Sequence, residues 1–124
     1  MRRLGLPLGA ALLFLGLGLI AGRRMTRVAV SGHSMEPGLR DGDWLIVVRN
    51  SRVSTGDVVV ARDPRENSRG IIKRVKDLGS DGQLLLSSDH PAHAGEEIGP
   101  VSPSAVLGRA WLRYWPPPRI GRVR

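Results

Sequence analysis

The chain has 124 residues, a formal net charge of +8 and no cysteine, so it holds one small domain at most and has no disulfide or thiolate chemistry. A charge this positive is common in nucleic-acid-binding proteins, but the arginines are scattered, aromatic residues are few, and no helix-turn-helix or zinc-finger spacing occurs. We therefore expect no nucleic-acid partner and attribute the positive charge to attraction for anionic lipid head groups.

The first predicted element is an uncharged run at residues 4–22 (LGLPLGAALLFLGLGLIAG), with arginines on both sides. As a helix it just crosses a hydrocarbon core of about 30 Å. A cleaved signal peptide is the alternative, because two arginines precede the run. Against it, the run is long, and the bulky Leu19 stands where a cleavage site needs a small residue. We predict a retained transmembrane anchor at residues 1–25 and a folded domain at residues 26–124.

After the anchor the chain shows short apolar runs separated by turn signals such as Asp-Gly and Thr-Gly-Asp. This pattern predicts strands and no long amphipathic helix. The polar segment 63–70 is predicted to be a loop. We expect a mainly β fold, a compact barrel-like all-β domain preceded by one transmembrane helix. The predicted strands are 27–31, 44–48, 58–61, 71–75, 84–86 and 106–114.

Ser34 is the candidate nucleophile of this domain. Gly32 before it and Pro37-Gly38 after it imply a tight backbone that exposes the serine and aims its amide at a developing oxyanion, although the same residues also fit an ordinary turn. A serine hydroxyl needs a base, which can be a histidine, a carboxylate or a neutral lysine. Of the histidines, His33 adjoins Ser34, and strand neighbours point to opposite faces. A Ser-His-Asp arrangement with His90 or His93 stays open.

Lys73 is the preferred base. On a strand it shares a face with Ile71 and Val75, and these apolar neighbours would desolvate the amine and lower its pKa. A lysine in a strand is by itself also typical of an exposed sheet edge.

A metal site is the weaker interpretation of a histidine-rich loop. His90, His93 and Asp89 are close in sequence and their side chains suit zinc, but no third strong ligand is evident. We expect no metal and no cofactor.

Four motifs in order resemble those of the type I signal peptidases. Residues 31–39 (SGHSMEPGL) resemble the nucleophile motif S-x-S-M-x-P-T-L or G-x-S-M-x-P-T-L. Residues 42–47 (GDWLIV) and 56–60 (GDVVV) resemble the two Gly-Asp strands that follow, and residues 72–75 (IKRV) resemble the lysine motif. The C-terminal part is similar to the mitochondrial inner membrane peptidase branch and its small bacterial relatives. The resemblance covers nearly the whole chain.

The resemblance implies a membrane-bound serine endopeptidase that cleaves N-terminal signal or leader peptides after small residues. Ser34 would be the nucleophile and Lys73 the general base, with an acyl-enzyme intermediate. The oxyanion would be held by the Ser34 amide, with Gly32 standing where many members have a second hydroxyl. Precursor proteins would bind as an added strand in shallow apolar pockets. Met35, Pro37 and Asp89 would support the site structurally.

The chain departs from the family pattern at residues 88–97 (SDHPAHAGEE), which correspond to a box G-D-N-x-x-x-S-x-D-S-R. The segment keeps Asp89, is about two residues shorter, and has Ala94 where the family serine that orients the lysine would fall. The aspartate of that box aligns nearest Glu96. Either the lysine is supported in another way or activity is reduced.

Three other functions stay open. The autocleaving SOS repressors share the Ser-Lys fold, but they carry a DNA-binding domain where this chain has its anchor. An inactive membrane scaffold is the second, and a dedicated maturation peptidase, of the kind that trims nickel-containing superoxide dismutase, is the third.

We expect a single-pass protein of a bacterial cytoplasmic membrane with its catalytic domain outside, although both anchor flanks are positive and the charge rule does not decide the orientation. A partner subunit is not identified by the sequence.

Overall fold

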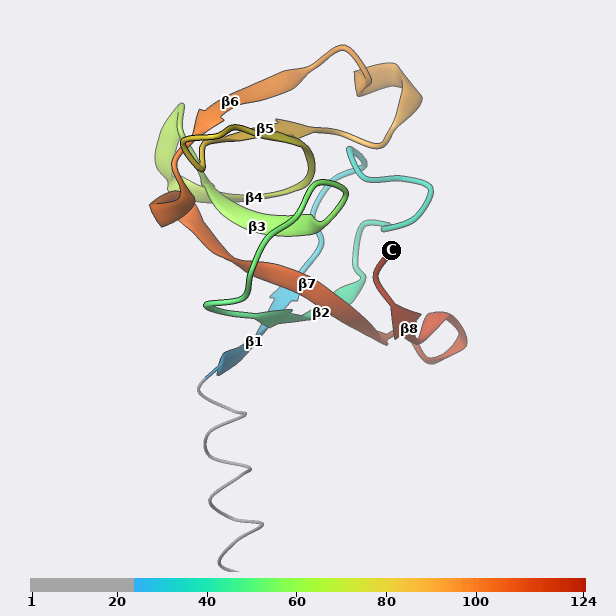
Figure 1. Cartoon of the computed structure of the whole chain (residues 1–124). Coiled ribbons are helices and arrows are strands. Elements are labelled where there is room, and N and C mark those ends of the chain that lie inside the picture. The colour runs from blue at the N-terminus through green and yellow to red at the C-terminus, as the bar shows by residue number, and fades with distance from the viewer. Residues whose placement is uncertain (1–23) are drawn as a thin grey trace, which may run out of the picture.

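The computed structural model describes residues 24–124, which form an antiparallel β-sheet (Figure 1). The predicted anchor lies outside the described residues except for its last two positions. Within residues 24–124 no helix has the length and apolar character needed to cross a membrane. The helical elements of that range are three-residue 3-10 turns: η1 (Pro91–His93), η2 (Pro103–Ala105) and η3 (Pro117–Arg119).

The strands follow the order β1-β2-β7-β3-β4-β5-β6, with β8 beside β7, and every neighbouring pair is antiparallel. The mainly β prediction is therefore confirmed. These pairings leave β1 and β6 as the edges, so they describe an open sheet without barrel closure. The strands are β1 (Met25–Ala29), β2 (Trp44–Val48), β3 (Val58–Asp63), β4 (Glu66–Leu78), β5 (Leu84–Ser87), β6 (Glu97–Val101), β7 (Val106–Trp115) and β8 (Gly121–Arg122).

The predicted loop at residues 63–70 is wrong. Strand β4 begins at Glu66, and β3 and β4 form a hairpin in which Arg62 pairs with Gly70 and Asp63 with Glu66. The segment was predicted to be a loop because it is polar, and residues 64–70 are indeed exposed. Its backbone nevertheless pairs with β3 at Gly70 and again at Glu66, with an irregularity at residues 67–69 between these pairs. Strand β6 was not predicted either, because its sequence EIGPV contains glycine and proline.

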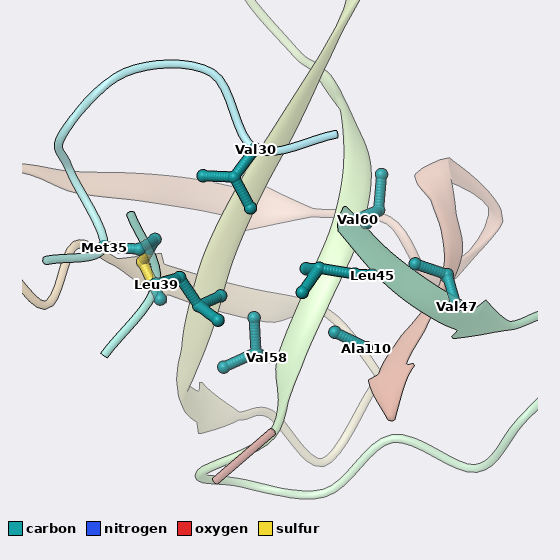
Figure 2. Packing of buried hydrophobic residues seen from close by; sticks show 8 residues of the cluster. All are labelled: Val30, Met35, Leu39, Leu45, Val47, Val58, Val60 and Ala110. Atoms are coloured by element: carbon teal, nitrogen blue, oxygen red, sulfur yellow. The ribbon is translucent and has the colours of Figure 1, made fainter. Parts of the chain in front are cut away.

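The β3–β4 hairpin is the centre of the domain because β3 is buried on both faces. Val58 and Val60 belong to one core cluster, and Val59 and Ala61 belong to a second. Each buried valine contributes roughly 1.5 to 3 kcal/mol. In the first cluster, Met35 and Leu39 from the connection between β1 and β2 lie among strand side chains (Figure 2). The two cores together hold β4, the strand that carries Lys73, in a fixed position.

Strands β2 and β7 approach closely at Gly108. A Cβ atom there would lie 2.6 Å from the Val48 carbonyl oxygen and 2.7 Å from a Val47 methyl, so a larger residue would push the two strands apart. The close contact keeps β7 against β2 and next to β3, which joins the two halves of the sheet.

Candidate active site

Ser34 lies in the connection between β1 and β2, which is fastened at both ends. The Val30 N–H donates to the Asp43 carbonyl at 2.8 Å, and the Gly42 N–H donates to the Val30 carbonyl at 2.9 Å. Between these ends, Met35 and Leu39 are buried in the core, at 2% and 5% exposure. The half-buried Ser34 precedes Met35 directly, so core packing fixes the place of the nucleophile candidate.

Two arginines from the C-terminal part of the chain hold the same connection. Arg113 and Arg119 both donate to the Gly38 carbonyl, at 2.7 and 3.2 Å. Arg119 also pairs with the buried carboxylate of Asp43 at 2.9 Å, and Arg113 lies 3.5 Å from it. A buried carboxylate needs such partners, because an unpaired charge in the interior is strongly destabilising. Residues distant in the sequence therefore stabilise the loop that carries Ser34.

The Ser34 N–H is a free donor within the described part of the chain. Gly32 has φ +89, a conformation that L side chains rarely adopt, and its N–H is used by the Asp41 carboxylate at 2.8 Å. The Ser34 N–H makes no hydrogen bond with any residue of the 24–124 range. Of the two residues predicted to form an oxyanion site, Ser34 thus has an available amide and Gly32 does not.

Lys73 lies on β4 between two buried residues of its own face, Ile71 at 7% and Val75 at 1% exposure. Its ammonium donates to the Ser88 hydroxyl at 2.8 Å. Burial is the main cause that lowers the pKa of Lys73; Glu96 opposes this effect, and the positive charges of Arg65 and Arg69 add to it. A larger fraction of this amine is therefore uncharged near neutrality than in a free lysine side chain.

Residues 88–90 connect the loop that carries Ser34 to β4, the strand that carries Lys73. Ser88 contacts Lys73, and two residues later the His90 N–H donates to the Ser34 carbonyl at 2.9 Å. Between them, Asp89 accepts two hydrogen bonds of 2.7 Å from the Arg74 guanidinium, on the residue after Lys73. Three consecutive residues therefore hold both parts of the predicted site.

Ser34 and Lys73 line the same pocket. In the described part of the chain, no hydrogen bond joins the Ser34 hydroxyl to the Lys73 amine. The amine donates its hydrogen bond to the Ser88 hydroxyl instead. Catalytic hydrogen bonds are often long in a peptidase without substrate. The pocket places the two side chains on one solvent-accessible space, and Pro37, also predicted to support the site, lines a neighbouring pocket with His90.

The histidines have other partners. His33 lies 2.6 Å from Glu36, which raises the pKa of His33, and His93 lies 3.1 Å from Glu96. His90 accepts from the Ala92 N–H at 3.0 Å. None of them lines the pocket that Ser34 and Lys73 share, so this geometry favours lysine over histidine as the base. No three potential metal-binding side chains converge within residues 24–124.

Sequence reasoning missed Ser88. The alignment put Ala94 at the place of the lysine-orienting serine, whereas the residue that contacts the lysine is six positions earlier. The signal was the hairpin register: β4 and β5 pair Arg74 with Ser87. In an antiparallel pair the next residue, Ser88, then lies opposite the preceding one, Lys73.

The pocket also exposes a free strand edge. β5 pairs with β4 only from Arg74 onward, so the edge of residues 70–73 that faces away from β3 has no strand partner in the described chain. Residues 69–73 and residues 28–32 both line the pocket. An unpaired edge of this kind accepts an extended peptide as an added strand.

Comparison with known proteins shows the family of the chain. A family model described as Peptidase S24-like matches residues 7–111. The chain is 36% identical over 130 residues to mitochondrial inner membrane protease subunit 2 of Danio rerio, covering 81% of this chain and 70% of that protein. It is 32% identical to mitochondrial ATP-independent inner membrane protease subunit 1a of Arabidopsis thaliana, covering 77% and 73%. A shorter match, 38% over 60 residues, covers 48% of this chain and 28% of signal peptidase I of Streptococcus pneumoniae.

The described domain is a β-sheet in which a half-buried serine and a half-buried lysine line one pocket. The chain belongs to the Peptidase S24-like family, and its homologues include mitochondrial inner membrane protease subunits and bacterial signal peptidase I. The resemblance inferred from the sequence motifs is confirmed.

The pKa of Lys73 can be measured directly. We expect the Lys73 amine to titrate below the value of about 10.4 found for free lysine, because burial disfavours its charged form. The measurement is an NMR titration of the full-length protein in detergent micelles with isotope-labelled lysine. Lys76→Arg assigns the signal, since Lys73 is then the remaining lysine. A midpoint at or above the free value would contradict the effect of burial.

Proposed function

We propose that the protein is a membrane-bound serine endopeptidase that removes N-terminal signal or leader peptides from precursor proteins, with Ser34 as nucleophile and Lys73 as general base. The observation that carries the proposal is the shared pocket: the serine with its free amide and the half-buried lysine line one space, beside an unpaired strand edge. No cofactor is required for this chemistry.

The reaction proceeds in two halves. The Ser34 hydroxyl attacks the peptide carbonyl carbon while its proton passes to the neutral Lys73 amine. The oxyanion accepts a hydrogen bond from the Ser34 N–H. The carbon–nitrogen bond then breaks, Lys73 returns the proton to the leaving amine, and an ester to Ser34 remains. Water loses a proton to Lys73, attacks the ester and releases the peptide, and Ser34 regains its proton.

Ser88 is the positioning residue for the lysine in this mechanism. It is buried at 7% exposure and holds the Lys73 amine at 2.8 Å, which fixes the rotamer of a flexible side chain. This supplies the support that the altered segment 88–97 lacks at Ala94. It also favours an active peptidase over an inactive scaffold.

The preference for small side chains near the cleaved bond is what the family resemblance implies. The lining of the pocket includes the apolar residues Val28, Val30 and Val60, which suit apolar side chains of a substrate. A general processing peptidase and a dedicated maturation peptidase both fit this pocket.

Membrane attachment is supported by an aromatic surface on β2 and β7. Trp44 and Trp115 are 40% and 52% exposed and pair across these strands. Tyr114 lies 6.5 Å from Trp44 by ring centroids, and Arg27 of β1 completes the group. Exposed tryptophan, tyrosine and arginine are typical of membrane–water interfaces. β1 follows the predicted anchor directly, so we propose that this surface lies at the lipid interface and that the domain faces the side on which exported precursors emerge.

Replacement of Ser34 or Lys73 by alanine should abolish cleavage of a precursor with an Ala-x-Ala site, with a loss of at least about a thousandfold in kcat/KM. The measurement is a cleavage assay with the full-length protein in detergent or liposomes. Lys76→Ala and Ser80→Ala, both on exposed positions away from the pocket, serve as controls with wild-type activity. The peptidase proposal is wrong if the wild-type protein leaves good substrates uncut.

Ser88→Ala should lower kcat about ten- to a hundredfold with little change in KM, because the base loses its fixed position while the substrate edge is intact. Ser88→Thr, which keeps a hydroxyl, should recover most of the activity. Ser87→Ala, on the neighbouring residue, is the matched control. Equal losses for the alanine and threonine variants, or a rise in KM alone, would show that Ser88 acts through packing instead.

Lipid contact at the aromatic surface can be tested by fluorescence quenching with brominated lipids. In liposomes holding the full-length protein, variants that retain only Trp44 or only Trp115 should be quenched. A control variant carries Leu78→Trp as its single tryptophan, since Leu78 is 39% exposed at the end of β4, away from the aromatic surface. Equal quenching at all three positions, or none at Trp44 and Trp115, would refute this orientation.

A further inference from the structure

Arg69 directly precedes the unpaired edge of β4, and Lys73 lies at the other end of that edge. Both residues line the pocket that holds Ser34. They are four positions apart on β4, so their Cα atoms are separated by about 13 Å. The buried Ile71, which also lines the pocket, lies between them in the sequence. The wall of the pocket is therefore apolar near the lysine and positively charged at its far end.

The Arg69 guanidinium forms no salt bridge in the described part of the chain. The charge of Arg69 contributes to the lowered pKa of Asp63, but both carboxylate oxygens of Asp63 accept hydrogen bonds from Arg65, at 3.1 and 3.2 Å. The Arg69 side chain makes no hydrogen bond with any described residue. Its charge nevertheless reaches the site, because it contributes to the lowered pKa of Lys73. A carboxylate placed in the pocket would meet a guanidinium that is free to bind it.

We propose that Arg69 selects substrates that carry an aspartate or glutamate about four residues from the cleaved bond. The inference rests on the proposed peptidase function and adds a charge requirement to the preference for small side chains. An extended peptide added to the β4 edge has the same rise per residue as β4 itself. When its scissile bond lies at Lys73, a side chain four residues away on the same face therefore lies beside Arg69.

The test measures binding and not turnover. Full-length Ser34→Ala protein in detergent micelles is titrated with fluorescent peptides that contain an Ala-x-Ala site and a single glutamate or glutamine, moved in turn to each position within five residues of the cleavage site. Glutamate should strengthen binding about two- to fivefold over glutamine at the position beside Arg69, as expected for a solvent-accessible ion pair. The gain should shrink at high salt.

Substitutions then assign the effect to one side chain. Arg69→Gln should remove the glutamate preference, and Arg69→Glu should reverse it in favour of lysine at the same position. Arg62→Gln is the matched control, since Arg62 is an exposed arginine of the same hairpin that pairs with Gly70 and does not line the pocket. It should leave the preference unchanged.

The proposal is overturned if no position shows a glutamate preference, or if Arg62→Gln removes the preference as completely as Arg69→Gln. These results are independent of the cleavage assay with wild-type protein. Cleavage without charge preference would refute the role of Arg69 and leave the peptidase function intact. Loss of cleavage in the wild-type protein would refute the function itself.

Discussion

The site depends on the hydrogen bonds of one short segment. The Ser88 hydroxyl accepts a hydrogen bond from the Lys73 amine, and the His90 N–H donates one to the Ser34 carbonyl. Residues 88–90 therefore set the distance between the loop that carries Ser34 and β4. Neither the loop nor the strand could fix that distance alone, because they are not neighbours in the sheet. The Arg74–Asp89 pair fixes the segment to the residue next to the lysine. The pair is partly buried and bidentate, the geometry in which such a contact has the greatest value.

A half-buried lysine is costly unless the rest of the fold holds it in place. Its ammonium form is disfavoured by burial, and the strand resists relaxation because Ile71 and Val75 are packed in the core on both sides of it. The two core clusters meet at β3, to which β4 is paired. Because β3 is buried on both faces, it holds β4 in place. β4 can therefore expose the Lys73 amine, whose pKa is lowered, to the pocket without a change in the position of the strand.

The sequence predicted the strand class, the alternation that buries Ile71 and Val75, and the family. These follow from periodicity and local motifs, which act over a few residues. It did not predict the strand at Glu66–Gly70, because its exposed polar side chains resemble those of a loop although its backbone pairs with β3 at both ends. Ser88 was missed for a different reason. Its contact with Lys73 follows from the register of β4 and β5, and an alignment by motif cannot determine a register when the segment differs in length. The hydrogen bonds from Arg113 and Arg119 to the Gly38 carbonyl join residues that are 75 and 81 positions apart. They could not be predicted, because local sequence patterns carry no information at such separations.

The unpaired edge of β4 explains why arginines are placed on this hairpin. An exposed strand edge can pair with the edge of another molecule, and proteins commonly prevent this with charged side chains. Arg65 and Arg69 are exposed on this hairpin, and positive charges beside the edge disfavour the approach of a second copy of the chain. Arg65 is paired with Asp63, whereas Arg69 lines the pocket. The residue that we propose to discriminate among bound peptides therefore also disfavours pairing of this edge with another copy.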